Sequence, residues 1–470
     1  MASVKHNTVF VAVGQVLRIV MAFMLLPVAS RVLGDESFGR YNLATTIMFF
    51  VMLVDDFGLN MWVTREIARF RDRAQRYFAY TAGLKFSLIL ASFLFVAVLV
   101  RVSPYDRETV HAIWIFAIYA VLISFRDLGI AIFRAYEMMV WETIVLSLER
   151  VLITSIGIFV LLSGGGLVGL SWAFVASAVI SLIVSAWIIV KKFLHLKIAL
   201  SLKEFLPMFK GASVFGVSMF LTTMYSRIDM IMLSLMKSPD VWGWYAAAHK
   251  LIDFTNVVPN ILMIATFPTL ARFSVSMQDQ LSALFTRGFK YLLILAIPLI
   301  PGIILLSHPI ILLINGEEFI NAVPALRVLS FTAAILFINI FAAGLFGATN
   351  NQGKLVIIQI VGLVLNASLN YLLIPGYAHV GAAVSTVITE STVMVVTLVY
   401  AFKKIVRLQE KRFIADAVVA ALVMTTVLWF LRNLNLFAIV FAGVFVYFGV
   451  LFLFKTISVK EFLSFKRSPN

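Results

Sequence analysis

Charged side chains occur inside the long apolar stretches of this sequence, where charge is costly. A charged side chain at the centre of a bilayer costs roughly 2.5–3.5 kcal/mol on insertion scales, so such residues are expected to face protein or water. The basic ones are Arg18, Lys85, Arg126, Arg150, Arg227 and Lys250, and the acidic ones include Asp55, Asp56, Asp229, Asp253 and Glu390. This pattern predicts polar zones that line a path through a membrane.

Arg18 has the clearest chemical prediction. Its apolar stretch contains no acidic residue, and it lies close to the middle of that stretch. A guanidinium without a carboxylate partner suits a bidentate hold on phosphate oxygens. The alternative is an ion pair with Asp55 or Asp56 on the next stretch.

Two pairs of neighbours, Arg126–Asp127 and Glu149–Arg150, have a structural alternative as well. Adjacent residues on a helix point in different directions, so each charge would need a partner on another helix. Such ion pairs would hold helices together rather than bind a solute.

The composition indicates a membrane protein. The chain is 62% hydrophobic and 13% charged, with a mean hydropathy of +1.01. The apolar runs predict an all-α polytopic fold of about fourteen transmembrane helices, since about 20 apolar residues cross a bilayer. The predicted spans are 8–33, 41–60, 79–101, 110–134, 141–163, 167–192, 208–235, 243–270, 289–314, 323–348, 353–375, 379–402, 413–432 and 435–455.

Basic residues orient these helices. With both ends inside, the inner segments carry 25 Lys and Arg residues and the outer loops carry six. Because basic residues concentrate on the cytoplasmic side, we expect a multi-pass protein of the cytoplasmic (plasma) membrane with both termini in the cytoplasm. The net charge of +15 then reflects topology and contact with anionic membrane lipids, and no nucleic-acid partner is expected.

Several kinds of catalytic site are missing from the sequence. It contains no cysteine, which excludes disulfides, cysteine nucleophiles and cysteine-ligated metals. Its six histidines form no HExxH spacing, and no Walker A or GxGxxG sequence occurs. We therefore expect a protein that is not an enzyme and carries no cofactor.

Two pairs of similar segments are separated by about 200 residues, which predicts a duplicated helical bundle. Duplicated bundles commonly build a pathway between two similar halves, so transport is the leading hypothesis. The predicted parts are an N-terminal bundle (1–200), a C-terminal bundle (201–405) and two additional helices with a tail (406–470). The first pair reads Phe38-Gly39-x-Tyr41 and Trp242-Gly243-x-Tyr245, and the second runs from Phe133 to Gly169 and from Phe346 to Gly381.

The order and spacing of several motifs resemble one family. They are Arg31-x-Leu33-Gly34-x-x-x-Phe38-Gly39-x-Tyr41, Asp56-Phe57-Gly58-Leu59, Thr64-Arg65-Glu66, Phe133-Arg134-Ala135, Arg227-x-Asp229 and Gly243-x-Tyr245-x-Ala247-Ala248. The chain resembles the polysaccharide-transporter family (Wzx-type oligosaccharide flippases) of the multidrug/oligosaccharidyl-lipid/polysaccharide exporter superfamily over nearly its whole length. That resemblance implies two pseudo-symmetric bundles around a central cavity, with two further C-terminal helices in some members.

The resemblance also implies a substrate and a mechanism. Such a flippase translocates a polyprenyl- or dolichyl-diphosphate oligosaccharide across the cytoplasmic membrane by alternating access. The headgroup needs a polar cavity, because diphosphate and sugars are costly to desolvate. Membrane lipids and glycan-assembly enzymes are the other expected partners. The implied diphosphate-binding residues are Arg18, Lys85, Arg126, Arg150, Arg227 and Lys250, and the acidic cavity or coupling residues are Asp55, Asp56, Asp253 and Glu390.

The coupling ion is expected to be Na⁺ or H⁺. Asn366 and Asn370 are four residues apart on one helix face, and Asp229 and Thr386 fall at a similar depth. Their oxygens together predict a Na⁺ site. The related peptidoglycan-precursor flippase implies an acid where this chain has Asn370. A hydrogen-bonded cluster that joins helices is the alternative.

Two other functions compete with this prediction. A cation-coupled multidrug antiporter of the related exporter branch would use an acid of the first bundle, such as Asp55 or Asp56, but an arginine in the first helix is unfavourable for cation binding. A membrane enzyme of glycan assembly would need a catalytic constellation, which the short loops do not provide.

Overall fold

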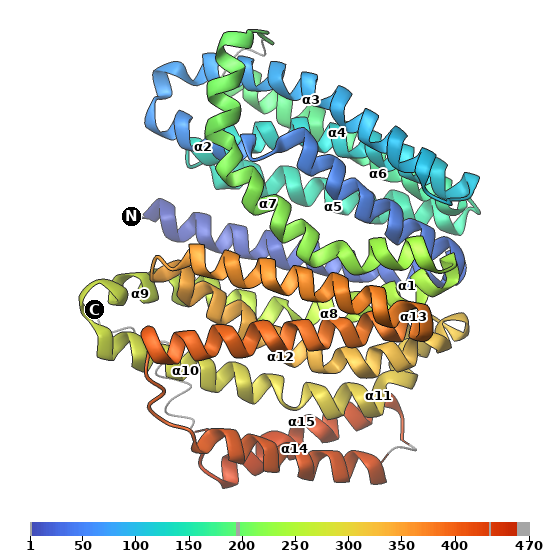
Figure 1. Cartoon of the computed structure of the whole chain (residues 1–470), viewed down its shortest axis with the longest axis vertical. Helices are drawn as coiled ribbons and strands as arrows, with labels where there is room; N and C mark the ends of the chain where they lie inside the picture. The colour runs from blue at the N-terminus through green and yellow to red at the C-terminus, as the bar shows by residue number, and fades with distance from the viewer. Residues whose placement is uncertain (1, 194–197, 432–433, 458–470) are drawn as a thin grey trace. The chain divides into compact units, whose positions relative to one another are not determined.

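The computed structural model describes residues 2–193, 198–431 and 434–457, and every regular element in these ranges is a helix (Figure 1). The chain divides into two compact units, Met1–Gly243 and Trp244–Asn470. The sequence analysis placed a boundary at residue 200 instead. The difference arises because α7 (Leu202–Met236) packs against α1, α2 and α3 of the first unit. The boundary of the duplicated segments stays a prediction.

The first unit is built around α1, which packs against α3, α4, α5, α6 and α7. Its elements are α1 (Ala2–Asp56), α2 (Leu59–Arg69), η1 (Arg71–Arg73), α3 (Ala74–Val102), α4 (Arg107–Ala135), α5 (Met139–Leu162), α6 (Gly166–Lys192), α7 and the start of α8 (Pro239–Thr255).

In the second unit, α12 packs against α9, α10, α11 and α13, and α14 and α15 pack on each other and on α11. The elements are the rest of α8, α9 (Val257–Ser276), α10 (Gln278–Ala296), α11 (Leu299–Ile314), η2 (Glu317–Ala322), α12 (Val323–Ala348), α13 (Gln352–Lys404), α14 (Arg412–Phe430) and α15 (Leu436–Leu453).

Two of the helices are too long for one crossing. The 55 residues of α1 would extend about 80 Å, whereas the hydrocarbon core is about 30 Å thick. A break at Gly34, with φ of 73°, turns α1 back along the bundle (Figure 1). A second break at Ala378 divides α13.

Eleven helices in the described chain are long and apolar enough to cross a membrane, and the bent pair in α7 adds a twelfth. Counting α1 and α13 as two spans each gives the fourteen predicted from the sequence. The all-α polytopic fold is therefore confirmed.

One predicted span ends earlier than expected. The span predicted over 41–60 stops at Asp56, because Phe57 and Gly58 have φ values of 36° and 82°. The chain then starts the short helix α2. A methyl group on Gly58 would lie 2.6 Å from the Ala212 carbonyl oxygen, so only glycine allows α7 to approach this break.

Each unit has its own core, which holds a different set of helices together. In the first unit, Trp62, Phe78 and Leu128 belong to a cluster that joins α2, α3, α4 and α7. In the second unit, Phe285 lies 5.1 Å from the Phe341 ring centre, which fixes α10 against α12. The Tyr447 hydroxyl donates to a backbone carbonyl of α10 at 2.7 Å, which ties α15 to that helix.

The duplicated motif supplies a close backbone contact within the first unit. A methyl group on Gly39 would lie 2.0 Å from the Pro239 carbonyl oxygen, and one on Gly243 would lie 2.0 Å from the Asp35 carbonyl oxygen. Each glycine thus meets the residue four positions before the other glycine. This reciprocal contact supports the interpretation of the two motifs as copies of one another.

Candidate functional site

The basic residues predicted to bind diphosphate fall into two groups in the first unit. Lys85 and Arg126 lie in buried ion pairs. Arg18, Arg150 and Arg227 form no ion pair with any residue that the structure describes. Since a paired cation is already neutralised, the two groups differ in what they can bind.

Lys85 is buried between α1, α3 and α4. Its ammonium donates to the Asp56 carboxylate at 2.8 Å and to the Ser124 hydroxyl at 2.8 Å. Only 1% of the Lys85 side chain is exposed. The prediction that Lys85 binds diphosphate does not fit this arrangement, because a phosphate would have to displace Asp56 from a desolvated pair.

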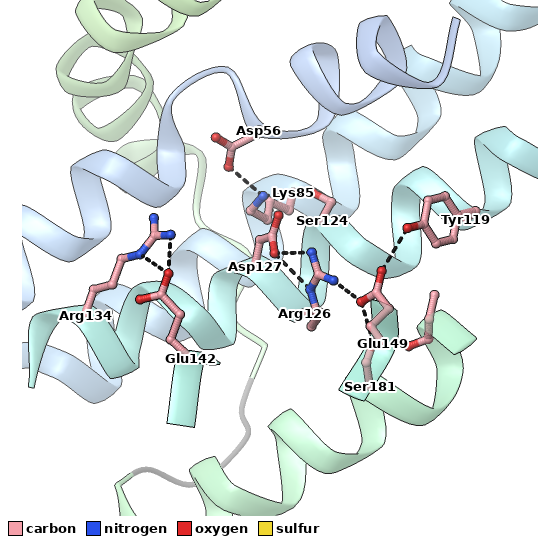
Figure 2. A network of polar contacts seen from close by, with 11 residues as sticks. Asp56, Lys85, Tyr119, Ser124, Arg126, Asp127, Arg134, Glu142, Glu149 and Ser181 are labelled. Carbon is pink, nitrogen blue, oxygen red and sulfur yellow. Dashed lines mark hydrogen bonds and ion pairs between the residues drawn. The ribbon is translucent and has the colours of Figure 1, made fainter. Parts of the chain in front are cut away.

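Arg126 on α4 belongs to a larger buried network (Figure 2). Its guanidinium donates to Glu149 on α5 and to its neighbour Asp127, the latter at 2.6 Å through Nη2. Glu149 also accepts hydrogen bonds from Tyr119 and Ser181, each at 2.8 Å. The predicted need for a partner on another helix is confirmed for Arg126 and Glu149.

This network explains how the charges are tolerated in an apolar bundle. A buried carboxylate is stable only if its oxygens receive hydrogen bonds and its charge is balanced. Both Glu149 oxygens have donors, and the network joins α4, α5 and α6. In this conformation Arg126 therefore takes part in joining α4, α5 and α6, and its role in substrate binding stays a prediction.

Arg18 has no such network. One of its nitrogens donates to the Gln15 side chain, and Nη1 is buried without a hydrogen-bond partner among the described residues. The alternative ion pair of Arg18 with Asp55 or Asp56 is not formed. The sequence analysis thus singled out a guanidinium that retains unused donors.

Arg150 and Ser147 of α5 complete the surroundings of Arg18. A methyl group on Gly14 would lie 3.5 Å from Arg18 Nη1 and 3.3 Å from Ser147 Oγ, so both groups lie at one point of the contact between α1 and α5. The Ser147 hydroxyl is also buried without a described partner. Glu142 and Arg150 of α5 both act electrostatically on Arg18, but the Glu142 carboxylate is already paired with Arg134. Two neighbouring cations and an unused hydroxyl form a cradle suited to a multiply charged anion.

Arg227 and Asp229 of α7 also belong to the first unit. The Arg227 guanidinium lies 4.6 Å from the centre of the Phe49 ring, a cation–π contact with the second part of α1. Both residues are partly exposed. Arg227 thus remains available for an anion, and its role stays a prediction.

The remaining charged candidates belong to the second unit. Lys250 is half-buried on α8, and the Asp253 carboxylate lies 3.5 Å from the His249 ring. Glu390 is buried on α13 and accepts a hydrogen bond of 2.6 Å from the Asn339 amide. Asn339 is a partner that the sequence analysis missed, because an amide in an apolar helix gives no charge signal.

The predicted Na⁺ ligands are divided between the units. Asp229 lies in the first, and Asn366, Asn370 and Thr386 are buried in the second. The Asn370 amide donates to the Asn366 oxygen at 2.8 Å, and the Thr386 hydroxyl donates to a backbone carbonyl one turn earlier at 2.9 Å. Both bonds lie within α13 and join no helices, so the Na⁺ site and the helix-joining cluster both stay predictions.

Several network residues gave no signal in the sequence. Tyr119, Ser124, Ser147 and Ser181 are common residue types in membrane helices. Their roles depend on which charged group each one faces, and that is decided by helix packing rather than by spacing along the chain.

Comparisons with known proteins agree with this fold and these helices. The polysaccharide biosynthesis protein family model matches residues 4–274, and the MatE family model matches residues 215–372. The chain is 24% identical over 461 residues to the Haloferax volcanii protein named probable low-salt glycan biosynthesis flippase Agl15, which covers 94% of both chains.

Two solved structures share the fold. A structure of the lipid II flippase MurJ in an inward closed conformation matches with a TM-score of 0.79 and 14% identity, over 95% of this chain and 98% of that one. An inward-facing multidrug resistance MATE family transporter of the MOP superfamily matches with a TM-score of 0.67 and 18% identity, over 83% and 94% of the two chains. At these identities the likeness concerns the fold alone.

Proposed function

This chain belongs to the polysaccharide biosynthesis protein family, and we propose that it is a flippase for a lipid-linked oligosaccharide. The substrate is an oligosaccharide on a polyprenyl or dolichyl diphosphate, and its headgroup crosses the membrane by alternating access. The names of Agl15 and MurJ, both flippases, support the transport of a lipid-linked glycan. The protein is a transporter rather than an enzyme.

The observation that carries this proposal is the cradle of Arg18, Arg150 and Ser147. A buried guanidinium nitrogen and a buried hydroxyl without partners are costly unless a ligand satisfies them. A diphosphate offers several anionic oxygens to these donors, and a guanidinium can hold two of them at once. A cationic drug would be repelled by the two arginines, which disfavours the multidrug antiporter.

Location and partners are parts of the same proposal. The many apolar helices make this a multi-pass membrane protein. The positive-inside bias supports the cytoplasmic membrane with both termini in the cytoplasm. Glycan-assembly enzymes that make or consume the lipid-linked oligosaccharide are proposed partners, with Na⁺ or H⁺ as the coupling ion.

The proposal is tested with proteoliposomes that contain a fluorescent lipid-diphosphate oligosaccharide. We expect the wild type to move the headgroup across the bilayer, and Arg18→Ala and Arg150→Ala to reduce the rate at least tenfold. That factor corresponds to about 1.4 kcal/mol, within the strength of one charge-assisted hydrogen bond. Arg18→Lys should recover only part of the rate, because an ammonium lacks the planar fork.

The matched control is Arg31→Ala, which removes the same charge from an exposed position of the same helix. If Arg18 matters because of where it lies and not only because of its charge, Arg31→Ala should transport at the wild-type rate. Wild-type protein that moves no such lipid but drives efflux of a cationic dye would replace this proposal with the multidrug antiporter.

A further inference from the structure

Asp55 is a buried carboxylate that the anion cradle does not use. It is fully buried in α1, and neither of its oxygens has a hydrogen-bond partner among the described residues. The Ser92 hydroxyl lies near enough to act on Asp55, but it donates its hydrogen bond to the Ile89 carbonyl at 2.9 Å. An ionised carboxylate in this position would be costly, since burial without donors removes its hydration and returns nothing.

The charges around Asp55 do not balance if every group is ionised. In the described chain, Lys85 on α3 and Asp56 on α1 are the titratable groups that act on Asp55. The Lys85 ammonium is 2.8 Å from Asp56, so it already neutralises that carboxylate. One cation therefore lies near two carboxyl groups, and a proton bound to Asp55 would make the net charge of the three groups zero.

We propose that Asp55 binds one exchangeable proton and that this proton is the ion coupled to transport of the lipid-linked oligosaccharide. The coupling part rests on the proposed flippase function. A proton suits this site better than Na⁺ does. Na⁺ needs several oxygen ligands, and the Lys85 ammonium would repel it.

Loss of the proton would change the Lys85–Asp56 pair. An ionised Asp55 competes with Asp56 for the one ammonium, so Lys85 shifts between the two carboxylates. The same Asp56 oxygen also accepts the backbone N–H of Asn60 at 3.1 Å. Asp56 thus holds the first turn of α2 across the break at Phe57 and Gly58, and a weaker hold on Asp56 frees that break to move.

The break is packed against the bend of α7. A methyl group on Gly216 would lie 2.6 Å from the Phe57 carbonyl oxygen. Within α7, Lys203–Ser213 and Phe215–Met236 are bent by 50°. A change at the break therefore reaches α7 through direct backbone contact. Asp55 therefore lies just before the break at Phe57 and Gly58, and this break packs against the bend of α7. Both are places where a helix can change its angle.

The proton site is tested by infrared difference spectroscopy of the purified protein, which separates the carbonyl band of a protonated acid from the bands of carboxylates. The wild type should show an acid band that disappears as the pH is raised. Asp55→Asn should lose this band, and Asp55→Glu should shift it. Asp56→Asn should also remove it, because Lys85 is then free to pair with an ionised Asp55.

The control is Asp106→Asn, which removes an exposed acid and should leave the band unchanged. A wild type without an acid band, or a band that survives in Asp55→Asn, would overturn the proton site. Because the measurement needs no lipid substrate, it stands even if the flippase proposal fails.

Coupling is tested by lipid transfer in proteoliposomes with and without a pH gradient. The gradient should accelerate the wild type severalfold, and transfer by Asp55→Asn should no longer respond to the gradient. Wild-type transfer that ignores a pH gradient would overturn the coupling claim and leave the flippase function in place. Absence of any transfer would overturn the flippase function instead.

Discussion

A double-variant experiment on Arg126 and Glu149 separates a structural role from a role in substrate binding. Glu149→Met leaves the Arg126 guanidinium buried with a single partner, Asp127, and removes the acceptor of Tyr119 and Ser181. Removing one member of a buried ion pair costs about 3–5 kcal/mol. We expect each single variant, Arg126→Met or Glu149→Met, to unfold at a much lower temperature than the wild type.

The double variant Arg126→Met/Glu149→Met should recover most of this loss. Apolar side chains of similar volume commonly replace a buried pair at little cost, so a coupling energy of about 2 kcal/mol or more is expected. The measurement is thermal unfolding in detergent, combined with lipid transfer in proteoliposomes. A stable double variant that transports lipid would show that the network is structural.

The chain supplies a matched control on the same two helices. Arg134 and Glu142 form an ion pair of 2.6 Å between α4 and α5, and 48% of the Arg134 side chain is exposed. Only 14% of the Glu142 side chain is exposed, but the pair reaches solvent through Arg134, so the corresponding variants should cost less stability than those of the buried pair. If the double variant of the buried pair loses as much stability as the single variants do, the network does not couple Arg126 to Glu149. A stable double variant that no longer transports would return Arg126 to the substrate site.

Two further predictions concern Asp106 and Gly39 of the first unit. Asp106 is exposed, and the slight desolvation that would raise its pKa is outweighed by hydrogen bonds from Thr109 and Arg40, which lower the pKa below the ordinary 3.8. The Asp106–Arg40 ion pair should therefore stabilise the protein at neutral pH by up to about 1 kcal/mol and weaken as the pH falls below about 4. In thermal unfolding measured against pH, Arg40→Ala should lose less stability below pH 4 than the wild type does. An equal loss in both proteins would contradict the assignment. Gly39→Ala should destabilise by about 1–3 kcal/mol, because its methyl group would meet the Pro239 carbonyl, whereas Gly302→Ala on α11 meets no atom within 4 Å and should be neutral or stabilising.

The fold was largely predictable because its determinant is local. A run of apolar residues must form a helix in a bilayer, since each backbone polar group needs a partner within the segment. The ends of the helices were harder to predict. The break after Asp56 depends on Phe57 and Gly58 adopting positive φ, and Phe57 gives no such indication in the sequence.

The site was predictable only in part. A charged residue in an apolar stretch can be recognised from the sequence, but the group that it contacts cannot. Arg18 was recognised as unpaired from the absence of any acid in its own stretch. Lys85 had the same sequence signal, yet α3 places it 2.8 Å from Asp56. Which cation meets which acid depends on helix rotation and depth, and neither is encoded in the spacing of charges along the chain.

The separation of paired and unpaired cations has a functional consequence. A guanidinium that binds and releases a diphosphate must not be neutralised permanently, and the acids near Arg18 and Arg150, Glu142 and Glu149, are paired with Arg134 and Arg126 instead. Their mutual repulsion must then be tolerated without substrate, and partial exposure to a wet cavity would reduce it. The buried Lys85–Asp56 pair differs from them, because its cation is already neutralised, and we propose that it responds to a proton on Asp55. Under the two proposals, Arg18 and Arg150 bind the substrate and the Asp55 site binds the ion, and α1 carries both Arg18 and Asp55.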